Sequence, residues 1–92
     1  MQINFYADLR ALVGRKTIEV KPVGSMTARQ ALESVTNPRP ALAERIWQAP
    51  SAPYDHIHVF INGRQSVFLP QGLDTPLEAD AELDVFPPVG GG

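Results

Sequence analysis

Four segments of the chain alternate apolar and polar residues, and each alternation predicts a half-buried β-strand. The first two segments, residues 2–6 and 17–21, are separated by a turn signal at Val13-Gly14-Arg15-Lys16. Together they predict an opening β-hairpin. Its inward side chains would be Ile3, Phe5, Ile18 and Val20.

The other two alternating segments lie in the C-terminal half, at residues 55–62 and 82–86. Asn62-Gly63 is the strongest short hairpin signal, because both residue types tolerate positive φ, and it leads to a short strand near residues 65–69. Residues 72–77 are rich in turn formers and predict a connection to the last strand. The inward side chains of the two long strands would be Ile57, Val59, Ile61, Leu83 and Val85.

A capping-box sequence, Thr27-Ala28-Arg29-Gln30, predicts a helix over residues 27–36. In this motif the first and fourth side chains each accept a hydrogen bond from the other residue's backbone amide. The two prolines of Asn37-Pro38-Arg39-Pro40 end the helix. A shorter second helix is expected over residues 41–48, followed by a loop over residues 49–53.

The resulting order, ββαββ with short helical or irregular insertions, predicts an α+β fold in which a mixed sheet packs on one main helix. This is the β-grasp arrangement, in which the last strand lies between the first and the third. The sequence contains no internal repeat or linker. We therefore expect one β-grasp domain over residues 1–86 and a C-terminal tail over residues 87–92.

The composition is that of one soluble domain, with 92 residues of which 43% are hydrophobic and 20% charged. The net charge of −2 argues against a nucleic-acid or anionic-membrane role, so the expected partners are proteins. No apolar run approaches the ~18 residues of a membrane span, and the N-terminus lacks the pattern of a signal peptide. We therefore expect a cytoplasmic protein.

Metal and thiol chemistry have little support in the sequence. Cysteine is absent, which excludes disulfides, thiolate nucleophiles and thiolate metal ligands. The two histidines, His56 and His58, would lie on one face of a strand, but two ligands rarely hold a metal without a third. We predict no metal site.

The C-terminal sequence Phe86-Pro87-Pro88-Val89 is followed by Gly90, Gly91 and Gly92. Proline fixes φ and glycine has no Cβ, so the chain would leave its last strand in a defined direction and end as a thin thread. The six residues after Phe86, at ~3.3 Å each, would carry the terminal carboxylate roughly 20 Å away. Such a thread fits a narrow tunnel in a partner. The alternative is an ordinary frayed terminus.

Three aromatic residues, Tyr6, Phe60 and Phe86, would point away from the helix, because strand side chains alternate between the two faces of a sheet. In the expected strand order these rings are neighbours and form an exposed apolar patch of the kind found at interfaces. The alternative is that loops near Trp47 or Phe68 cover them.

Five short sequences carry a resemblance to a known family over essentially the whole chain. They are Phe5-Tyr6-Ala7-Asp8-Leu9-Arg10, Met26-Thr27-Ala28-Arg29, Ile61-Asn62-Gly63-Arg64, Leu73-Asp74-Thr75-Pro76-Leu77 and Phe86-Pro87-Pro88-Val89-Gly90-Gly91-Gly92. With these motifs the chain resembles the MoaD/ThiS family of ubiquitin-like sulfur carriers, and within it most of all the small subunits of molybdopterin synthases. The terminal Phe-Pro-Pro-Val-x-Gly-Gly pattern is the specific part.

The resemblance implies a carrier that is not itself an enzyme and holds no permanent cofactor. An E1-like adenylating enzyme would use ATP to form an acyl-adenylate at Gly92, and a sulfur donor would convert it to a thiocarboxylate. Gly91 and Gly92 would let the backbone approach the nucleotide phosphates closely. The sulfur would then go to a pterin precursor within a molybdopterin synthase, whose large subunit would be a partner of the carrier. The implied partner-binding residues are Tyr6, Phe60, Phe86, Pro87, Pro88, Val89 and Gly90.

Other functions share the same C-terminal sequence. A ubiquitin-like modifier would be attached through activated Gly92 to lysines of other proteins. Related sulfur carriers serve transfer-RNA thiolation or the synthesis of cysteine or thiamine. A third possibility is a β-grasp interaction module whose tail takes no part in chemistry.

Overall fold

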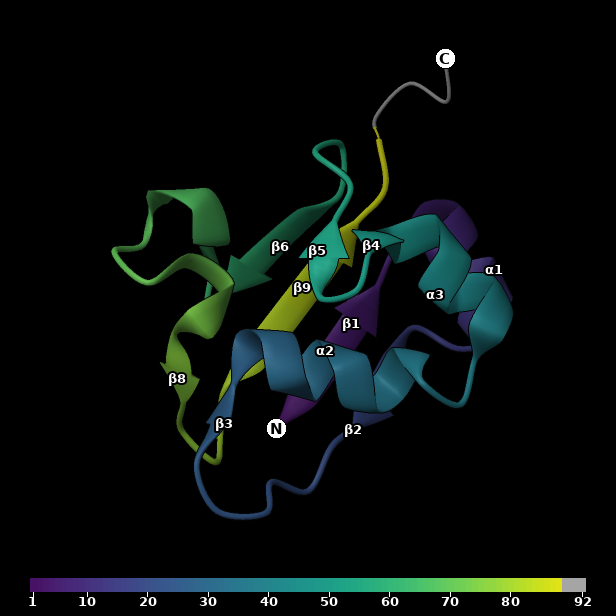
Figure 1. The fold of residues 1–92 in the computed structure, drawn as a ribbon. Coiled ribbons are helices and arrows are strands. Elements are labelled where there is room, and N and C mark those ends of the chain that lie inside the picture. Colours follow the sequence, from purple (N-terminus) through teal and green to yellow (C-terminus); the bar gives the residue numbers. More distant parts are fainter. Residues whose placement is uncertain (89–92) are drawn as a thin grey trace.

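The computed structural model of the protein describes residues 1–88 (Figure 1). A five-stranded mixed sheet has the order β2-β1-β9-β6-β7. Strands β1 and β9 at its centre run parallel, and the other pairs run antiparallel. The strands are β1 (Gln2–Phe5), β2 (Thr17–Glu19), β6 (His58–Ile61), β7 (Arg64–Gln65) and β9 (Glu82–Phe86). The expected position of the last strand, between the first and the third, is confirmed, as is the β-grasp fold.

Helix α2 (Ala28–Thr36) packs on one face of this sheet, and its capping box is confirmed (Figure 1). The Thr27 hydroxyl accepts from the Gln30 amide at 3.2 Å, and the Gln30 side chain accepts from the Thr27 amide at 2.9 Å. An N-cap of this kind contributes about 1 kcal/mol to helix stability. The buried side of the helix consists of Ala28, Ala31, Leu32, Val35 and Thr36.

The hydrophobic core lies between α2 and the sheet. Ile3, Phe5, Leu83 and Val85, which face α2 from the two central strands, are all 0% exposed. Each fully buried side chain of this size contributes about 1.5–3 kcal/mol by leaving water. Of the other residues expected to point inward, Ile18 is partly buried and packs against the core, and the rest are buried.

The opening hairpin is confirmed in its pairing, with Ile3 opposite Ile18, but its connection is a helix rather than a simple turn. Helix α1 (Ala7–Val13) connects β1 to β2, packs against α3 and ends at Gly14, whose φ of 86° closes the helix in the left-handed region. Its Leu9 is 0% exposed. The helix is only seven residues long, too short for the hydrophobic period to distinguish it from a loop.

The predicted second helix is present as α3 (Pro40–Ile46), two residues shorter at its C-terminus than expected. The following residues, expected to form a loop, instead make a small hairpin of β4 (Trp47–Ala49) and β5 (Ala52–Pro53). The helix ends because Trp47 is extended, and its indole N–H donates to the Thr36 hydroxyl at 2.9 Å. That contact is tertiary, so the local sequence does not predict it.

The Asn62-Gly63 hairpin is confirmed, with φ of 50° and 84° at the two turn residues between β6 and β7. The strand expected near residues 65–69 is shorter, because a 3₁₀ turn, η1 (Ser66–Phe68), replaces most of it. The turn-rich segment contains a second 3₁₀ turn, η2 (Gly72–Asp74), and strand β8 (Pro76–Leu77). Strand β8 pairs with β3 (Met26–Thr27) at the start of α2.

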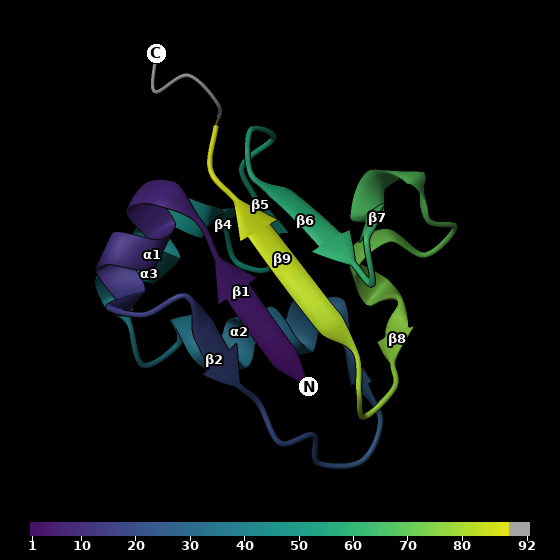
Figure 2. The same cartoon turned by 180° about the vertical axis from the view of Figure 1, so that it is seen from behind.

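The two faces of the sheet differ in how they are covered. Helices α2 and α3 and the β4–β5 hairpin lie on one side (Figure 1), whereas the view from behind shows β1, β9 and β6 without a covering element (Figure 2). We call this second side the outer face. None of the helices formed by residues 1–88 is long and apolar enough to cross a membrane.

Candidate functional site

The outer face brings together residues that lie far apart in the sequence. The strand register places Asp84 of β9 between Asn4 of β1 and Phe60 of β6. In the next row, Phe86 lies opposite His58. Because alternate side chains of a strand point to the same face, these residues form one continuous surface.

Tyr6, Phe60 and Phe86 form what we call the aromatic cluster. The rings of Tyr6 and Phe86 stack with centroids 4.3 Å apart and an interplanar angle of 9°. The ring of Phe60 meets Phe86 edge-on at 5.4 Å and 79°. All three residues are half-buried rather than buried. The rings therefore lie together, as the strand order predicts, and keep part of their surface accessible to a partner.

The loops near Trp47 and Phe68 do not cover the aromatic cluster or make it part of the protein's own core. Trp47 is hydrogen-bonded to Thr36 on the helix side of the sheet. Phe68 is itself 81% exposed, so it provides little cover for another ring. The partner-binding role of the cluster stays a prediction.

A shallow hollow of about 310 Å³ lies beside the cluster, lined by His58, Phe60, Gln65 and Phe86. The amide nitrogen of Gln65 lies 2.7 Å from Nδ1 of His58. The two side chains are hydrogen-bonded, and the tautomer of the imidazole sets which of them donates. The hollow thus combines two aromatic rings with one fixed polar pair, a composition that suits an apolar side chain of a partner.

A hydrogen-bond network lies on the other side of the cluster, centred on Asn4, which is only 6% exposed. Its amide nitrogen donates to Asp84 at 2.9 Å and to Glu82 at 3.1 Å, and its carbonyl oxygen accepts from the Thr17 hydroxyl at 2.6 Å. Buried polar groups are costly unless they are paired in this way. The network joins β2, β1 and β9 across the outer face.

Tyr6 connects this polar network to the aromatic cluster. Its hydroxyl donates to the Asp84 carboxylate at 3.0 Å, and Nζ of Lys16 lies 5.1 Å from its ring centroid. Loss of hydration raises the pKa of Tyr6 above its usual value of about 10, and the hydrogen bond to Asp84 and the charges of Asp84 and Glu82 add to the effect. The hydroxyl therefore stays protonated at neutral pH and can hold the ring in place.

The aromatic cluster also fixes the point at which the tail leaves the domain. Strand β9 ends at Phe86, and Pro87 is buried whereas Pro88 is exposed. The backbone amide of Tyr6 donates to the carbonyl of Val85 at 3.3 Å, which extends the parallel pairing by one residue. The other predicted tail residues, Val89, Gly90, Gly91 and Gly92, lie outside the residues that the structure describes.

The two histidines are in separate environments. His56 stacks on Tyr54, with ring centroids 5.0 Å apart, while His58 is paired with Gln65. Within residues 1–88 no group of three or more His, Cys, Asp or Glu side chains is arranged to hold a metal ion.

Sequence reasoning named the three rings but missed the polar half of the outer face. Asn4 and Asp84 are the central polar residues of two predicted strands, so their outward direction could have been inferred. Their contact could not, because parallel pairing brings together residues 80 positions apart. Lys16 was assigned to a turn, and only the fold places it over Tyr6.

Comparisons with known proteins identify relatives that match the chain over its whole length. A family model described as the ThiS family matches residues 3–92. Small archaeal modifier protein 1 of Haloferax volcanii is 35% identical over 92 residues, which cover all of both chains. Small archaeal modifier protein 3 of the same organism is 33% identical over 92 residues, covering 100% of this chain and 98% of that protein.

The solved structures extend the comparison. A crystal structure of the Haloferax volcanii modifier protein 1 superposes with a TM-score of 0.85, at 34% identity and with 99% of this chain and 97% of that chain covered. A putative molybdopterin converting factor, subunit 1, from Pyrococcus furiosus has a TM-score of 0.74 at 21% identity, with 96% and 95% covered. At that identity the second likeness concerns the fold alone.

Proposed function

We propose a function for this chain, which belongs to the ThiS family of small ubiquitin-like sulfur carriers and modifiers. It carries an activated acyl group at Gly92 and presents it to partner enzymes. Members of this group are carriers and modifiers rather than enzymes, so the catalytic residues for activation belong to a partner. The observation that carries the proposal is the position of the aromatic cluster, on the uncovered face of the sheet and at the base of the tail.

The first step is activation of the carboxylate, which is a poor electrophile because of its negative charge. An oxygen of the Gly92 carboxylate attacks the α-phosphate of ATP, an acyl-adenylate forms and pyrophosphate leaves. An E1-like adenylating enzyme provides the site. Without side chains, Gly91 and Gly92 allow the backbone to approach the nucleotide.

The second step is sulfur transfer. Hydrosulfide supplied by a sulfur donor attacks the Gly92 carbonyl, the bond to AMP breaks, and loss of the proton leaves the Gly92 thiocarboxylate. We propose that the thiocarboxylate then gives its sulfur to a pterin precursor bound to the large subunit of a molybdopterin synthase. The terminal Phe-Pro-Pro-Val pattern and the fold shared with a putative molybdopterin converting factor support this destination.

The outer face would dock these partners. Aromatic residues are favoured anchors at protein interfaces, and the hollow beside Phe60 and Phe86 can receive a side chain. Phe86 belongs to both the docking surface and the base of the tail. A partner that binds this surface therefore meets the tail, beginning with Pro87 and Pro88, at a defined position.

A second candidate is covalent modification of proteins, in which a lysine amine attacks activated Gly92 and forms an isopeptide bond. The observation that favours it is that both full-length curated relatives, at 35% and 33% identity, are named as modifiers. Both functions use the same activation step, so they differ only in the group that attacks Gly92.

The intact mass of the protein purified from its native host tests these functions. Replacement of one carboxylate oxygen by sulfur adds about 16 Da, and this species would support the sulfur carrier. Higher-mass conjugates that disappear when Gly92 is deleted would support the modifier. Only unmodified protein, in cells that contain the activating enzyme, would contradict both.

A further inference from the structure

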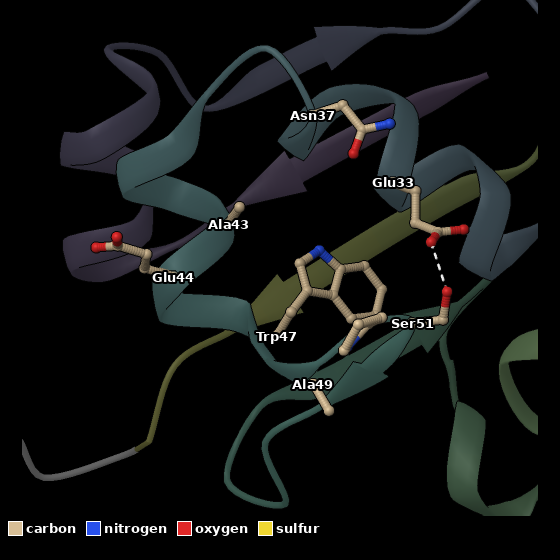
Figure 3. A pocket seen from close by; sticks show the side chains of 8 residues that line it. Glu33, Asn37, Ala43, Glu44, Trp47, Ala49 and Ser51 are labelled. Atoms are coloured by element: carbon tan, nitrogen blue, oxygen red, sulfur yellow. Dashed lines mark hydrogen bonds between the residues drawn. The ribbon is translucent and has the colours of Figure 1, made fainter.

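A cleft on the helix side of the molecule lies away from the outer face. It is formed where α2, α3 and the β4–β5 hairpin meet, and its volume is about 420 Å³ (Figure 3). Ligand pockets in proteins typically measure about 300–1,000 Å³, so the cleft is large enough for one long side chain. No step of the proposed carrier chemistry uses it.

Trp47 forms the aromatic surface of this cleft. Its indole N–H donates to the hydroxyl of Thr36, a residue that is 1% exposed, so the polar edge of the ring is occupied inside the protein. The small side chains of Ala43 and Ala49 flank the indole (Figure 3). Neither alanine is large enough to cover it. The indole is therefore held in one orientation with a face open to the cleft.

Acidic and amide groups form the walls. Glu33 and Glu44 line the cleft, and within the described residues no lysine or arginine does. The Glu33 carboxylate accepts from the Ser51 hydroxyl at 2.7 Å (Figure 3), which positions it but uses only one of about four acceptor sites. Asn37, the C-cap of α2, contributes an amide at the same wall.

Arg29 contacts the wall of the cleft and does not line it. Arg29 donates to the backbone carbonyl of Ser51 and forms an ion pair with Asp74 at 3.0 Å. The first contact ties the β4–β5 hairpin to α2, and the second ties α2 to η2. The hairpin side of the cleft is therefore built into the fold and does not depend on a ligand.

We propose that this cleft binds an arginine side chain presented by a partner protein. A guanidinium is planar and cationic, so it can stack on the indole while its N–H groups donate to the Glu33 carboxylate. Lysine offers a compact charge without stacking, and its affinity is lower for that reason. A neutral apolar side chain would offer no hydrogen-bond donor to the remaining acceptor sites of the Glu33 carboxylate.

The sheet separates this cleft from the outer face (Figures 1 and 2). A partner that occupies the aromatic cluster leaves the cleft open to a second protein. The arginine site does not rest on the proposed carrier function, and its test measures binding without any activating enzyme.

Trp47 is the only tryptophan of the chain, so its fluorescence and its indole N–H signal in a ¹H–¹⁵N spectrum report on this cleft alone. The probe is the blocked peptide acetyl-Gly-Arg-Gly-amide, titrated into the full-length protein. The neutral isostere with citrulline in place of arginine and the lysine peptide are titrated in parallel. We expect saturable shifts at residues 33, 37, 47 and 49 with arginine, weaker binding with lysine and none with citrulline.

Three variants sharpen the test. Glu33→Gln keeps an acceptor for Ser51 but removes the charge, and it should lower affinity about tenfold, as loss of a charge-assisted hydrogen bond does. Ala49→Leu covers the indole at an exposed position and should abolish binding. Glu78→Gln removes the same charge from an exposed site outside the cleft and should leave affinity unchanged.

The proposal is overturned if citrulline binds as tightly as arginine, because charge would then be irrelevant. Equal affinity for lysine would remove the role of stacking. Wild-type affinity in Glu33→Gln, or arginine shifts confined to residues outside the cleft, would also exclude it.

Discussion

Replacement of Phe60 by alanine separates the docking role of the aromatic cluster from a role in the core. Phe60 is half-buried and meets Phe86 edge-on at 5.4 Å. Half of the burial energy of a phenylalanine is about 1 kcal/mol, and an edge-to-face pair adds about 0.5–1.5 kcal/mol. We therefore expect Phe60→Ala to lower the free energy of unfolding by about 2 kcal/mol. The same change at the fully buried Phe5 should cost about 3–5 kcal/mol.

The effect of Phe60→Ala on partner binding should be larger than its effect on folding would suggest. An interface anchor contributes at least about 2 kcal/mol, which corresponds to roughly a 30-fold weaker complex. The assay is ATP–pyrophosphate exchange with the cognate adenylating enzyme. The KM for the carrier should rise by this factor while kcat changes little, because Phe60 belongs to β6 and is not part of the tail sequence that bears the reacting carboxylate.

Phe68 provides a matched control for this experiment. It is 81% exposed and lies outside the aromatic cluster, so Phe68→Ala should change neither urea stability nor KM. Two results would refute the reasoning. A loss of stability in Phe60→Ala equal to that of Phe5→Ala would assign the ring to the core, and an unchanged KM would remove it from the interface.

The remaining predictions concern the tail and the polar network. Deletion of Gly92, or addition of one alanine after it, should abolish pyrophosphate exchange while the circular dichroism spectrum stays the same, since one residue moves the carboxylate by ~3.3 Å. Exchange at the normal rate would show that Gly92 is not the reactive terminus. Asn4→Ala should cost about 1–3 kcal/mol in urea unfolding, because it removes the hydrogen bonds that a buried side chain makes to the partly buried Asp84 and Thr17; a loss below 0.5 kcal/mol, roughly the range of ordinary surface changes, would contradict this. The raised pKa of Tyr6 contributes stability that is complete below pH ~10 and is lost as the pH rises through the folded-state value. The stability of Tyr6→Phe should therefore fall less steeply than wild type above pH ~10, and parallel curves would exclude the role of this hydroxyl.

Local sequence signals predicted most of the fold. The capping box at Thr27 and the Asn62-Gly63 turn each depend on residues within four positions. Both features can therefore be predicted from the local sequence. The alternation in Glu82–Phe86 gave the last strand its observed bounds. In such segments the local preference and the tertiary environment require the same conformation.

The elements that were missed depend on contacts between distant residues. Helix α1 has a single fully buried residue, Leu9, and its packing against α3 is not visible in its own seven residues. The β4–β5 hairpin likewise depends on Trp47 bonding to Thr36 and on Ser51 bonding to Glu33. Ser51 also has a φ of 60°, which the residue type alone does not suggest.

The candidate site was predictable to the extent that it follows from strand alternation. The outward direction of Tyr6, Phe60 and Phe86 follows from the period of two, and their proximity follows from the strand order. The contacts of Asp84 required the exact register between β1 and β9. The cleft at Trp47 had no sequence signal, because three separate elements form it.

The parallel pairing of β1 and β9 connects the proposed docking surface to the base of the tail. It places Tyr6, at the end of the first strand, against Phe86, the last residue of the last strand. Tyr6 is itself held by Asp84 and lies beneath Lys16, so the residue that contacts the tail's base is fixed from two sides. A partner that binds Tyr6 and Phe86 would therefore also contact the first residues of the tail, which follow Phe86 directly. In the proposed function the domain therefore orients the tail, and the partner supplies the group that attacks Gly92.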